Sequence, residues 1–369
     1  MSQPQPPSML MFVGTYTRRE PHVVGKSEGI YVYRMNPTTS ELSYVSLIRG
    51  VENPSYLVVH PNHTHVYAVN EVADFGGENG AVSSFAIDPQ TGELTFVNQQ
   101  SSHGTAPCYA TVDQTGRYVF AANYGSGSAC MLPILPDGSL GPASDWVQHV
   151  GSSVNPRRQT GPHAHSINID PTNRFVYVAD LGMDKVMAYS IDFAGGKLVP
   201  AQQPFVQAVP GVGPRHMDFH PNGRFAYLIT EIGNTVVTYA MDEATGALTE
   251  LQTLSTLPAG WDGTSHTADI HITPDGRFLY GSNRGHDSLA IFAVDSTTGL
   301  LTAAGHVSTG GKTPRNFVID PSGTFVLAAN QNSDTIVHFR IDLDTGALTP
   351  TGHETEVPTP VCQKLIPWH

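Results

Sequence analysis

Cysteine is scarce in this sequence. Only three cysteines, Cys108, Cys130 and Cys362, occur among 369 residues, which is too few for a disulfide framework, and none has the C-x-x-C spacing of a zinc site. We interpret all three as reduced thiols with mostly structural roles. Cys108 lacks an evident partner base, so we predict a core or lining thiol there.

Basic residues are also few. The chain has 19 Lys and Arg against 32 Asp and Glu, which gives a formal net charge of −13 at pH 7. Nucleic acids and anionic membranes attract a basic face, so neither is an expected partner. An anionic small molecule would have to meet locally placed arginines.

Long apolar segments are missing as well. The N-terminal MSQPQPPSML has neither the basic region nor the apolar region of a signal peptide, and no later segment approaches the length that spans a bilayer. We therefore expect a cytoplasmic protein in which residues 1–9 form a flexible tail.

The signatures of several enzyme classes are absent. No G-x-G-x-x-G follows a strand, and no G-x-S-x-G marks a nucleophilic serine between a strand and a helix. His163 and His165 alternate on one strand face and offer only two metal ligands. The prediction is a protein without a metal or another cofactor.

Turn-forming residues are abundant. The chain has 36 Gly and 28 Pro with 40% hydrophobic residues, a composition typical of a folded core built from short strands and many turns. One pattern of four strands, A to D, recurs along the chain and is clearest from Pro214 to Gln252. Strand A ends in His-Pro or Asp-Pro, and a Thr-Gly type of turn joins strands C and D.

Seven copies of this pattern predict a seven-bladed β-propeller. The ends of strand A recur at intervals of about 46 to 57 residues, close to the blade length of four-stranded propeller repeats. The chain begins with a B-like strand, LMFVGTY, and ends with a lone A-like strand, VCQKLIP. We therefore predict a single all-β domain over residues 1–369, in which the C-terminal strand closes the first blade.

The two faces of such a disc differ in their loops. The A–B and C–D turns are short and uniform, whereas the B–C and D–A connections include irregular segments at 17–28, 72–80, 151–161 and 258–265. Varied loops on a rigid scaffold usually carry function. The ligand site is therefore expected where strand A begins and strand B ends, at one mouth of the central channel.

Aligning the copies predicts which residues surround this mouth. The start of strand A reads Ser55, Cys108, His165, Arg215, Ala268, Arg315 and Val361, and the residue after the last B position reads Tyr16, Glu71, Tyr124, Leu181, Glu231, Arg284 and Gln331. The preceding column, Asn70, Asn123, Asp180, Asn283 and Asn330 among others, is explained for the most part by capping of strand ends. A propeller does not need the charged members of this collection in order to fold.

The sequence resembles the bacterial 6-phosphogluconolactonase family of seven-bladed propellers, which also includes fungal enzymes that interconvert a carboxymuconate and its lactone. The resemblance covers almost the whole chain and rests on FVGTYT at 12–17, VYAVNE at 66–71, GPHAHSI at 161–167, GPRHMDFHPNGRFAYLITE at 213–231 and YGSNRGHDSLAIF at 280–292. The active-site set proposed for the family, one His, two Arg and one Glu, falls on His165, Arg215, Glu231 and Arg284. His163 is a near alternative to His165.

Lactone hydrolysis requires a base for water and positive donors for the oxyanion. We expect Glu231 or His165 to activate water, Arg215 to stabilise the oxyanion, and Arg284 to bind a carboxylate or phosphate of an anionic lactone. Glu231 has a second interpretation, a salt bridge to Arg215 or Arg284 that only neutralises charge. The candidate substrate-binding residues are Glu71, Tyr124, His163, His216, Asn283, His286, Arg315 and Gln331.

Two alternatives remain at this point. A lactone-forming cycloisomerase of the carboxymuconate type would use the same ring of residues. A non-catalytic propeller that binds proteins would instead present a flat or apolar mouth, which the clustered Arg, Glu and His disfavour. Because a closed ring has no sheet edge that demands a partner, we expect a monomer.

Overall fold

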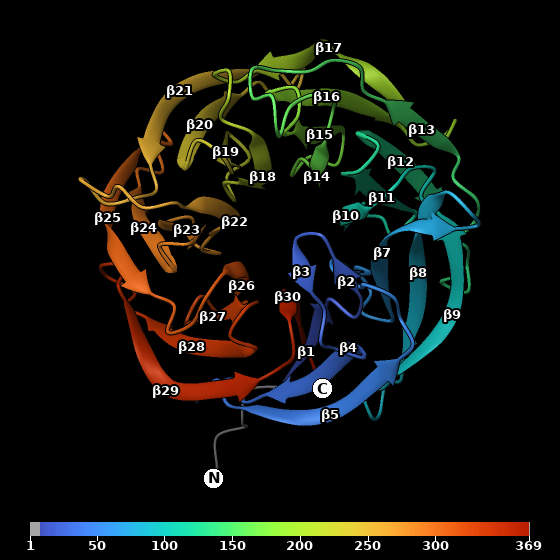
Figure 1. Ribbon diagram of the computed structural model, residues 1–369, viewed down its shortest axis with the longest axis horizontal. Coiled ribbons are helices and arrows are strands. Elements are labelled where there is room, and N and C mark those ends of the chain that lie inside the picture. The colour runs from blue at the N-terminus through green and yellow to red at the C-terminus, as the bar shows by residue number, and fades with distance from the viewer. Residues whose placement is uncertain (1–7, 369) are drawn as a thin grey trace.

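The computed structural model describes residues 8–368, which form strands joined by turns and loops and contain no helix. Seven four-stranded antiparallel sheets are arranged in a ring around a central channel (Figure 1). The prediction of a seven-bladed, all-β propeller is therefore confirmed. Nothing among the described residues forms a helix with the length and apolar character needed to cross a membrane.

The first blade contains both ends of the chain. From the channel outward it consists of β30 (Pro360–Pro367), β1 (Met9–Thr15), β4 (Gly29–Met35) and β5 (Leu42–Arg49). The predicted closure of this blade by the C-terminal strand is confirmed, since β1 pairs with β30 from Met9↔Pro367 onward. Residues 1–7 of the expected tail lie outside the described residues, but Met9 is a buried strand residue, so the tail was predicted to be too long.

The other six blades follow the chain in order. The second to fourth blades contain β6 (Leu57–Val59), β7 (His65–Phe75), β8 (Asn79–Ile87) and β9 (Leu94–Ser101); β10 (Pro107–Val112), β11 (Tyr118–Asn123), β12 (Ser128–Pro133) and β13 (Asp145–Gln148); and β14 (Ala164–Ile169), β15 (Phe175–Asp180), β16 (Lys185–Asp192) and β17 (Lys197–Gln207).

The fifth to seventh blades repeat the same order. They contain β18 (Pro214–Phe219), β19 (Phe225–Thr230), β20 (Thr235–Met241) and β21 (Leu248–Ser255); β22 (His266–Ile272), β23 (Phe278–Arg284), β24 (Ser288–Val294) and β25 (Leu301–Ser308); and β26 (Pro314–Ile319), β27 (Phe325–Asn330), β28 (Thr335–Ile341) and β29 (Leu348–Glu356). A short hairpin, β2 (Arg19–Glu20) with β3 (Val23–Val24), projects toward the centre of the ring (Figure 1).

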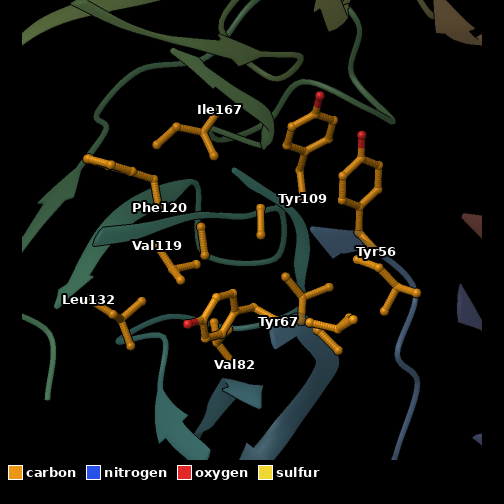
Figure 2. Close-up of a cluster of buried hydrophobic side chains, with 14 of the residues drawn as sticks. Tyr56, Tyr67, Val82, Tyr109, Val119, Phe120, Leu132 and Ile167 are labelled. Carbon is orange, nitrogen blue, oxygen red and sulfur yellow. The ribbon is translucent and has the colours of Figure 1, made fainter. Parts of the chain in front are cut away.

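The core lies between neighbouring blades. Figure 2 shows one such cluster, in which side chains of the second, third and fourth blades interlock. The rings of Tyr56 and Tyr109 stack with centroids 4.0 Å apart, and Phe120 is fully buried beside them. Burial of an aromatic or aliphatic side chain of this size contributes about 1.5–3 kcal/mol, so the faces between blades hold the ring together.

The six turns that join strands A and B share one backbone feature. The fourth residue of each of these six turns has a positive φ, as at Gly116 (68°), Gly223 (72°) and Asn173 (59°). Glycine and asparagine adopt this conformation at low cost, which explains their recurrence at that position. These short turns lie on the face opposite the irregular loops, so one face of the disc is uniform and the other is free to vary.

Candidate active site

A cavity of about 780 Å³ opens at the mouth of the channel on the face of the irregular loops. It is lined by the β2–β3 hairpin, by the starts of inner strands and by the ends of second strands. Its ionisable lining comprises Arg18, Glu20, His22, Glu71, Asp74, Cys108, Tyr124, Arg158, His165, Glu231, His266, Arg284 and Arg315. Of the twelve residues predicted for the site, six line this cavity: Glu71, Tyr124, His165, Glu231, Arg284 and Arg315.

A repeated β-bulge brings inner-strand residues to this mouth. In five blades one residue at the start of the inner strand has no partner on the next strand, so that Pro214 faces Thr230 and His216 faces Ile229, with Arg215 between them. Cys108, His165, Arg315 and Val361 occupy the same bulged position in their blades. A bulge re-aims the side chain of its extra residue, which is how these blades direct side chains toward one place.

Glu231 is the centre of a cluster of arginines. Arg158 donates from Nη2 to Oε1 at 2.6 Å, while Arg215 donates from Nε to Oε2 at 2.9 Å. Nη2 of Arg284 lies 3.0 Å from the same Oε2, and Nε2 of His165 lies 3.8 Å from it. The contacts of Glu231 therefore match the second interpretation, in which this residue forms ion pairs with arginines.

These contacts decide the protonation state of Glu231. Burial alone would raise the pKa of this carboxyl, but Arg284 and Arg215, followed by His165 and Arg158, outweigh burial and hold its pKa well below the usual value. A carboxylate with a depressed pKa is a weak proton acceptor. Glu231 is therefore suited to holding arginines in place and poorly suited to activating water.

Arg215 lies beneath the cavity and does not line it. Its side chain is only 1% exposed, and its guanidinium also donates to the carbonyl oxygen of Ala268 and lies 3.1 Å from Nε2 of His216. The expectation that Arg215 contacts the substrate oxyanion is not met in this geometry, because the packed inner strands enclose the side chain. His216 is enclosed with it and bonds to Oδ1 of Asp269 at 2.7 Å.

The structure separates the two histidines of the GPHAHSI segment. His165 lines the cavity, whereas His163 stacks on the ring of Tyr124, with centroids 4.6 Å apart, and its Nδ1 lies 2.9 Å from the Tyr124 carbonyl oxygen. Burial and the charge of Arg215 hold the pKa of His165 well below its ordinary value. The imidazole of His165 is therefore neutral at physiological pH.

Three further candidates lie away from the cavity. Asn283 is fully buried and bonds to Thr256 and Ser288. These contacts match the capping of strand ends that the sequence predicted for most of the equivalent Asn and Asp residues. His286 bonds to Oγ of Ser288 and contacts the ring of Trp261 edge-on. Gln331 lies in a separate depression on the other side of the β2–β3 hairpin. Strand ends point their last side chains in different directions, and the aligned columns do not carry that information.

Several residues of the cavity were not identified as site residues from the sequence. Arg158 comes from the long 151–161 loop, and Arg18 to His22 come from the hairpin after the first strand. His266 begins β22. The only available signal was the irregular length of these loops, which does not tell how far a loop folds back over the channel.

No group of three or more His, Cys, Asp or Glu side chains within residues 8–368 is arranged to hold a metal ion. Cys108 is 6% exposed, and its Sγ lies 3.8 Å from Nδ1 of His165. Burial and the nearby Glu71 raise the pKa of this thiol far above its ordinary value. Cys108 is therefore a neutral lining thiol without nucleophilic character.

Comparison with known proteins agrees with this architecture. The family model described as "Lactonase, 7-bladed beta-propeller" matches residues 10–365. The 6-phosphogluconolactonase of Bacillus subtilis is 37% identical over 309 residues, 84% of each chain. That of Pectobacterium carotovorum is 37% identical over 298 residues, 80% of this chain and 82% of the relative. The solved structure of the Pseudomonas aeruginosa periplasmic gluconolactonase PpgL is 37% identical, with a TM-score of 0.91 over 98% of this chain and 100% of that one.

Proposed function

The chain belongs to the lactonase family of seven-bladed β-propellers and is a lactonase, and we propose that it opens a sugar-acid lactone of the gluconolactone type, with or without a phosphate group. The observation that carries this proposal is the convergence of four arginines on one cavity of about 780 Å³. A cavity of this volume is ample for a six-carbon sugar lactone.

Arg284 is the proposed donor to the oxyanion. Its Nη2 bonds to the carbonyl oxygen of Thr267 at 2.8 Å and faces Glu231, whereas Nη1 makes no hydrogen bond to any residue in 8–368. Glu231, which is itself anchored by Arg215, pairs with this guanidinium from below. A donor fixed before the reaction stabilises the charge that develops on the carbonyl oxygen without reorganising.

Arg315 is the proposed partner of an anionic group on the substrate. Arg18, Arg158 and Arg284 each pair with a carboxylate at 3.2 Å or less. Arg315 forms no ion pair within the described part of the chain, and its guanidinium carbon lies 5.4 Å from the centre of the Tyr16 ring. A guanidinium without a carboxylate partner favours a phosphate or carboxylate.

The experiment is a pH-indicator assay of a lactone panel, corrected for spontaneous opening, with 6-phosphogluconolactone, gluconolactone and a carboxymuconate lactone. We expect hydrolysis of at least one of the two sugar lactones. Replacement of Arg315 by Met should raise KM for 6-phosphogluconolactone about 10- to 100-fold, the effect of losing a charged hydrogen-bonded pair, and should leave KM for gluconolactone nearly unchanged. Equal effects on both lactones would contradict the role of Arg315.

The cycloisomerase remains the alternative reaction for the same residues. It predicts conversion of the carboxymuconate lactone without consumption of water and no acceleration of sugar-lactone opening. The non-catalytic scaffold is set aside, since relatives that are lactonases extend over most of the chain. The cytoplasmic location and the monomeric state stay predictions, which cell fractionation and light scattering would check.

A further inference from the structure

Glu71 and Glu231 are two of the carboxylates that line the cavity, and they differ in what surrounds them. Glu231, from the fifth blade, receives three arginines, so its oxygens are occupied and its charge is neutralised. Glu71, in β7 of the second blade, is 7% exposed and lines the same cavity. No arginine lies within ion-pair distance of it among the described residues.

The two oxygens of Glu71 have separate surroundings. Oε2 accepts hydrogen bonds from Oη of Tyr16 at 2.8 Å and from Oγ of Ser55. Oε1 receives no hydrogen bond from any residue in 8–368, and its nearest basic atom is Nε2 of His22 at 3.9 Å. It is also not one of the fully enclosed polar atoms without a partner, so this oxygen faces the cavity.

Hydrogen bonds hold the Glu71 side chain in this orientation. The Tyr16 hydroxyl donates to Glu71, so it accepts from Nε2–H of His22 at 3.2 Å, and burial together with Arg315 lowers the pKa of His22 to about 4. The neutral His22 thus steadies Tyr16 without adding a charge. One oxygen of Glu71 is anchored and the other is free, which is the arrangement that a general base requires.

The surroundings of Glu71 also favour proton uptake. Burial raises the pKa of this carboxyl, and the opposing influences of Arg315, Ser55 and Tyr16 do not cancel it. The ionisable groups that face Glu71 are Tyr16, Glu20, His22, Cys108 and Arg315. A carboxylate with a raised pKa accepts a proton more readily than Glu231 does.

We propose that Glu71 is the general base that takes a proton from the attacking water, an inference that rests on the proposed lactone hydrolysis. Oε1 accepts one proton as the water oxygen forms a bond to the lactone carbonyl carbon and the π electrons move to the carbonyl oxygen. Collapse of this oxyanion breaks the bond to the ring oxygen, which takes the proton back from Glu71 and leaves as a hydroxyl. One water and one lactone give one hydroxy acid.

The first test is Glu71→Gln, which keeps the shape of the side chain but cannot accept the proton. We expect kcat to fall about 10²- to 10⁴-fold, the usual contribution of a general base, with KM changed no more than a few-fold. Wild-type kcat/KM should fall toward low pH as Glu71 becomes protonated, and the variant should lack this acidic limb. Circular dichroism and thermal unfolding verify that the variant folds.

The second test is Ser55→Ala, which removes a hydrogen bond that lowers the pKa of Glu71. The acidic limb of kcat/KM should therefore move to higher pH while the enzyme stays active. Ser84→Ala is the matched control, because Ser84 is a buried serine of the same blade that bonds to the Gly138 carbonyl. Its acidic limb should coincide with that of the wild type.

The results distinguish the role of Glu71 from the proposed lactone hydrolysis. An active wild type together with a folded Glu71→Gln variant of undiminished kcat, or a Ser55→Ala limb at the wild-type position, would overturn the role of Glu71 and leave lactone hydrolysis standing. A wild type that opens no lactone would instead overturn the proposed function itself.

Discussion

Arg215 and Arg158 bind the same carboxylate but differ in their exposure to water. The Arg215 side chain is 1% exposed and that of Arg158 is 35% exposed. Removal of one partner from a buried pair costs about 3–5 kcal/mol because it leaves a buried charge uncompensated, whereas an exposed pair contributes about 1 kcal/mol or less. We expect Arg215→Met to lose several times more unfolding free energy than Arg158→Met in urea titrations at pH 7. Similar losses would mean that Glu231 is not anchored from below.

His271 predicts a pH dependence of stability. Its Nε2 lies 3.1 Å from Oδ2 of Asp269 and its Nδ1 lies 3.6 Å from Oδ2 of Asp218. Burial would lower the pKa of His271, but these two carboxylates raise it to about 9. A folded-state pKa above the unfolded value near 6.5 stabilises the protein fully below pH 6.5, and this stability is lost as pH rises through 9.

The unfolding free energy should therefore fall by roughly 1–3 kcal/mol between pH 6.5 and 9.5, measured by urea titration at each pH. His271→Gln should be less stable at pH 6.5 and should lose less unfolding free energy than the wild type over that window, and the fall that remains comes from the buried cysteines, whose pKa values are raised in the folded state. A histidine with a lowered pKa, such as His216 at about 3, contributes a slope of the opposite sign, most of which lies below pH 6.5. A wild-type curve that is flat from pH 6.5 to 9.5 would refute the charged state of His271.

Position within the repeat was enough to find some site residues but not others. His165, Glu231 and Arg284 could be placed at the channel mouth because each has a counterpart in the other copies. Arg158 has no counterpart, since it belongs to a loop that occurs once. The burial of the Arg215 side chain could not be predicted from the sequence either, because it depends on how the neighbouring inner strands pack over it.

The inner strands carry a sequence signal for their bulges. Proline directly precedes the residue at the start of strand A in five copies: Pro54, Pro107, Pro214, Pro314 and Pro360. Proline within a sheet is confined largely to edges, first positions and bulges. The repeated proline therefore marks the bulge that turns Cys108, Arg215 and Arg315 toward the channel.

The side chain of Asn53 links the β2–β3 hairpin to the second blade, in addition to the ion pairs of Arg18 with Glu52 and Asp74. Its Oδ1 accepts the backbone N–H groups of Thr17 and Arg18 at 3.0 and 2.9 Å, and its Nδ2 donates to Oε1 of Glu20 and to the Glu71 carbonyl oxygen at 2.8 and 3.2 Å. Asn53 has a positive φ of 38°, which glycine also adopts. Asn53→Gly therefore removes the hydrogen bonds of this side chain without straining the backbone, while the ion pairs of Arg18 remain.

We expect Asn53→Gly to raise KM about 5- to 30-fold, equivalent to roughly 1–2 kcal/mol of lost preorganisation, with a smaller effect on kcat. The matched control is Asn173→Gly, at a positive φ of 59° in an A–B turn on the opposite face, where KM should stay at the wild-type value. Steady-state kinetics on the preferred lactone give the KM of both variants. Equal KM values would show that the hairpin does not shape the site.

Contacts between blades repeat with the sequence copies. Tyr177, Tyr227 and Tyr280, each on a second strand, donate from the hydroxyl to the carbonyl oxygen of the turn glycine in the next blade at 2.6, 3.1 and 2.8 Å. A repeat thus encodes its own contact with its neighbour, and this is why the ring could be predicted from the periodicity alone. The loops over one mouth obey no such period, and their paths had to come from the structure.

Closure of the ring depends on the last strand, since β30 supplies the inner strand of the first blade and packs between β26 and β6. Removal of residues 360–369 would expose the edge of β1 and leave one gap in the circle of inner strands. Exposed edges pair with other chains, so the shortened protein should aggregate or unfold at a temperature lower by more than about 10 °C, the shift expected from losing several kcal/mol in a domain of this size.

A synthetic peptide of residues 360–369 should restore soluble, active protein in a concentration-dependent manner, because it binds only the folded ring. A peptide with Cys362, Lys364 and Ile366 replaced by proline cannot donate the backbone hydrogen bonds that join β30 to β1 and serves as the control. Full stability of the shortened chain without any peptide would show that six complete blades suffice to hold the circle.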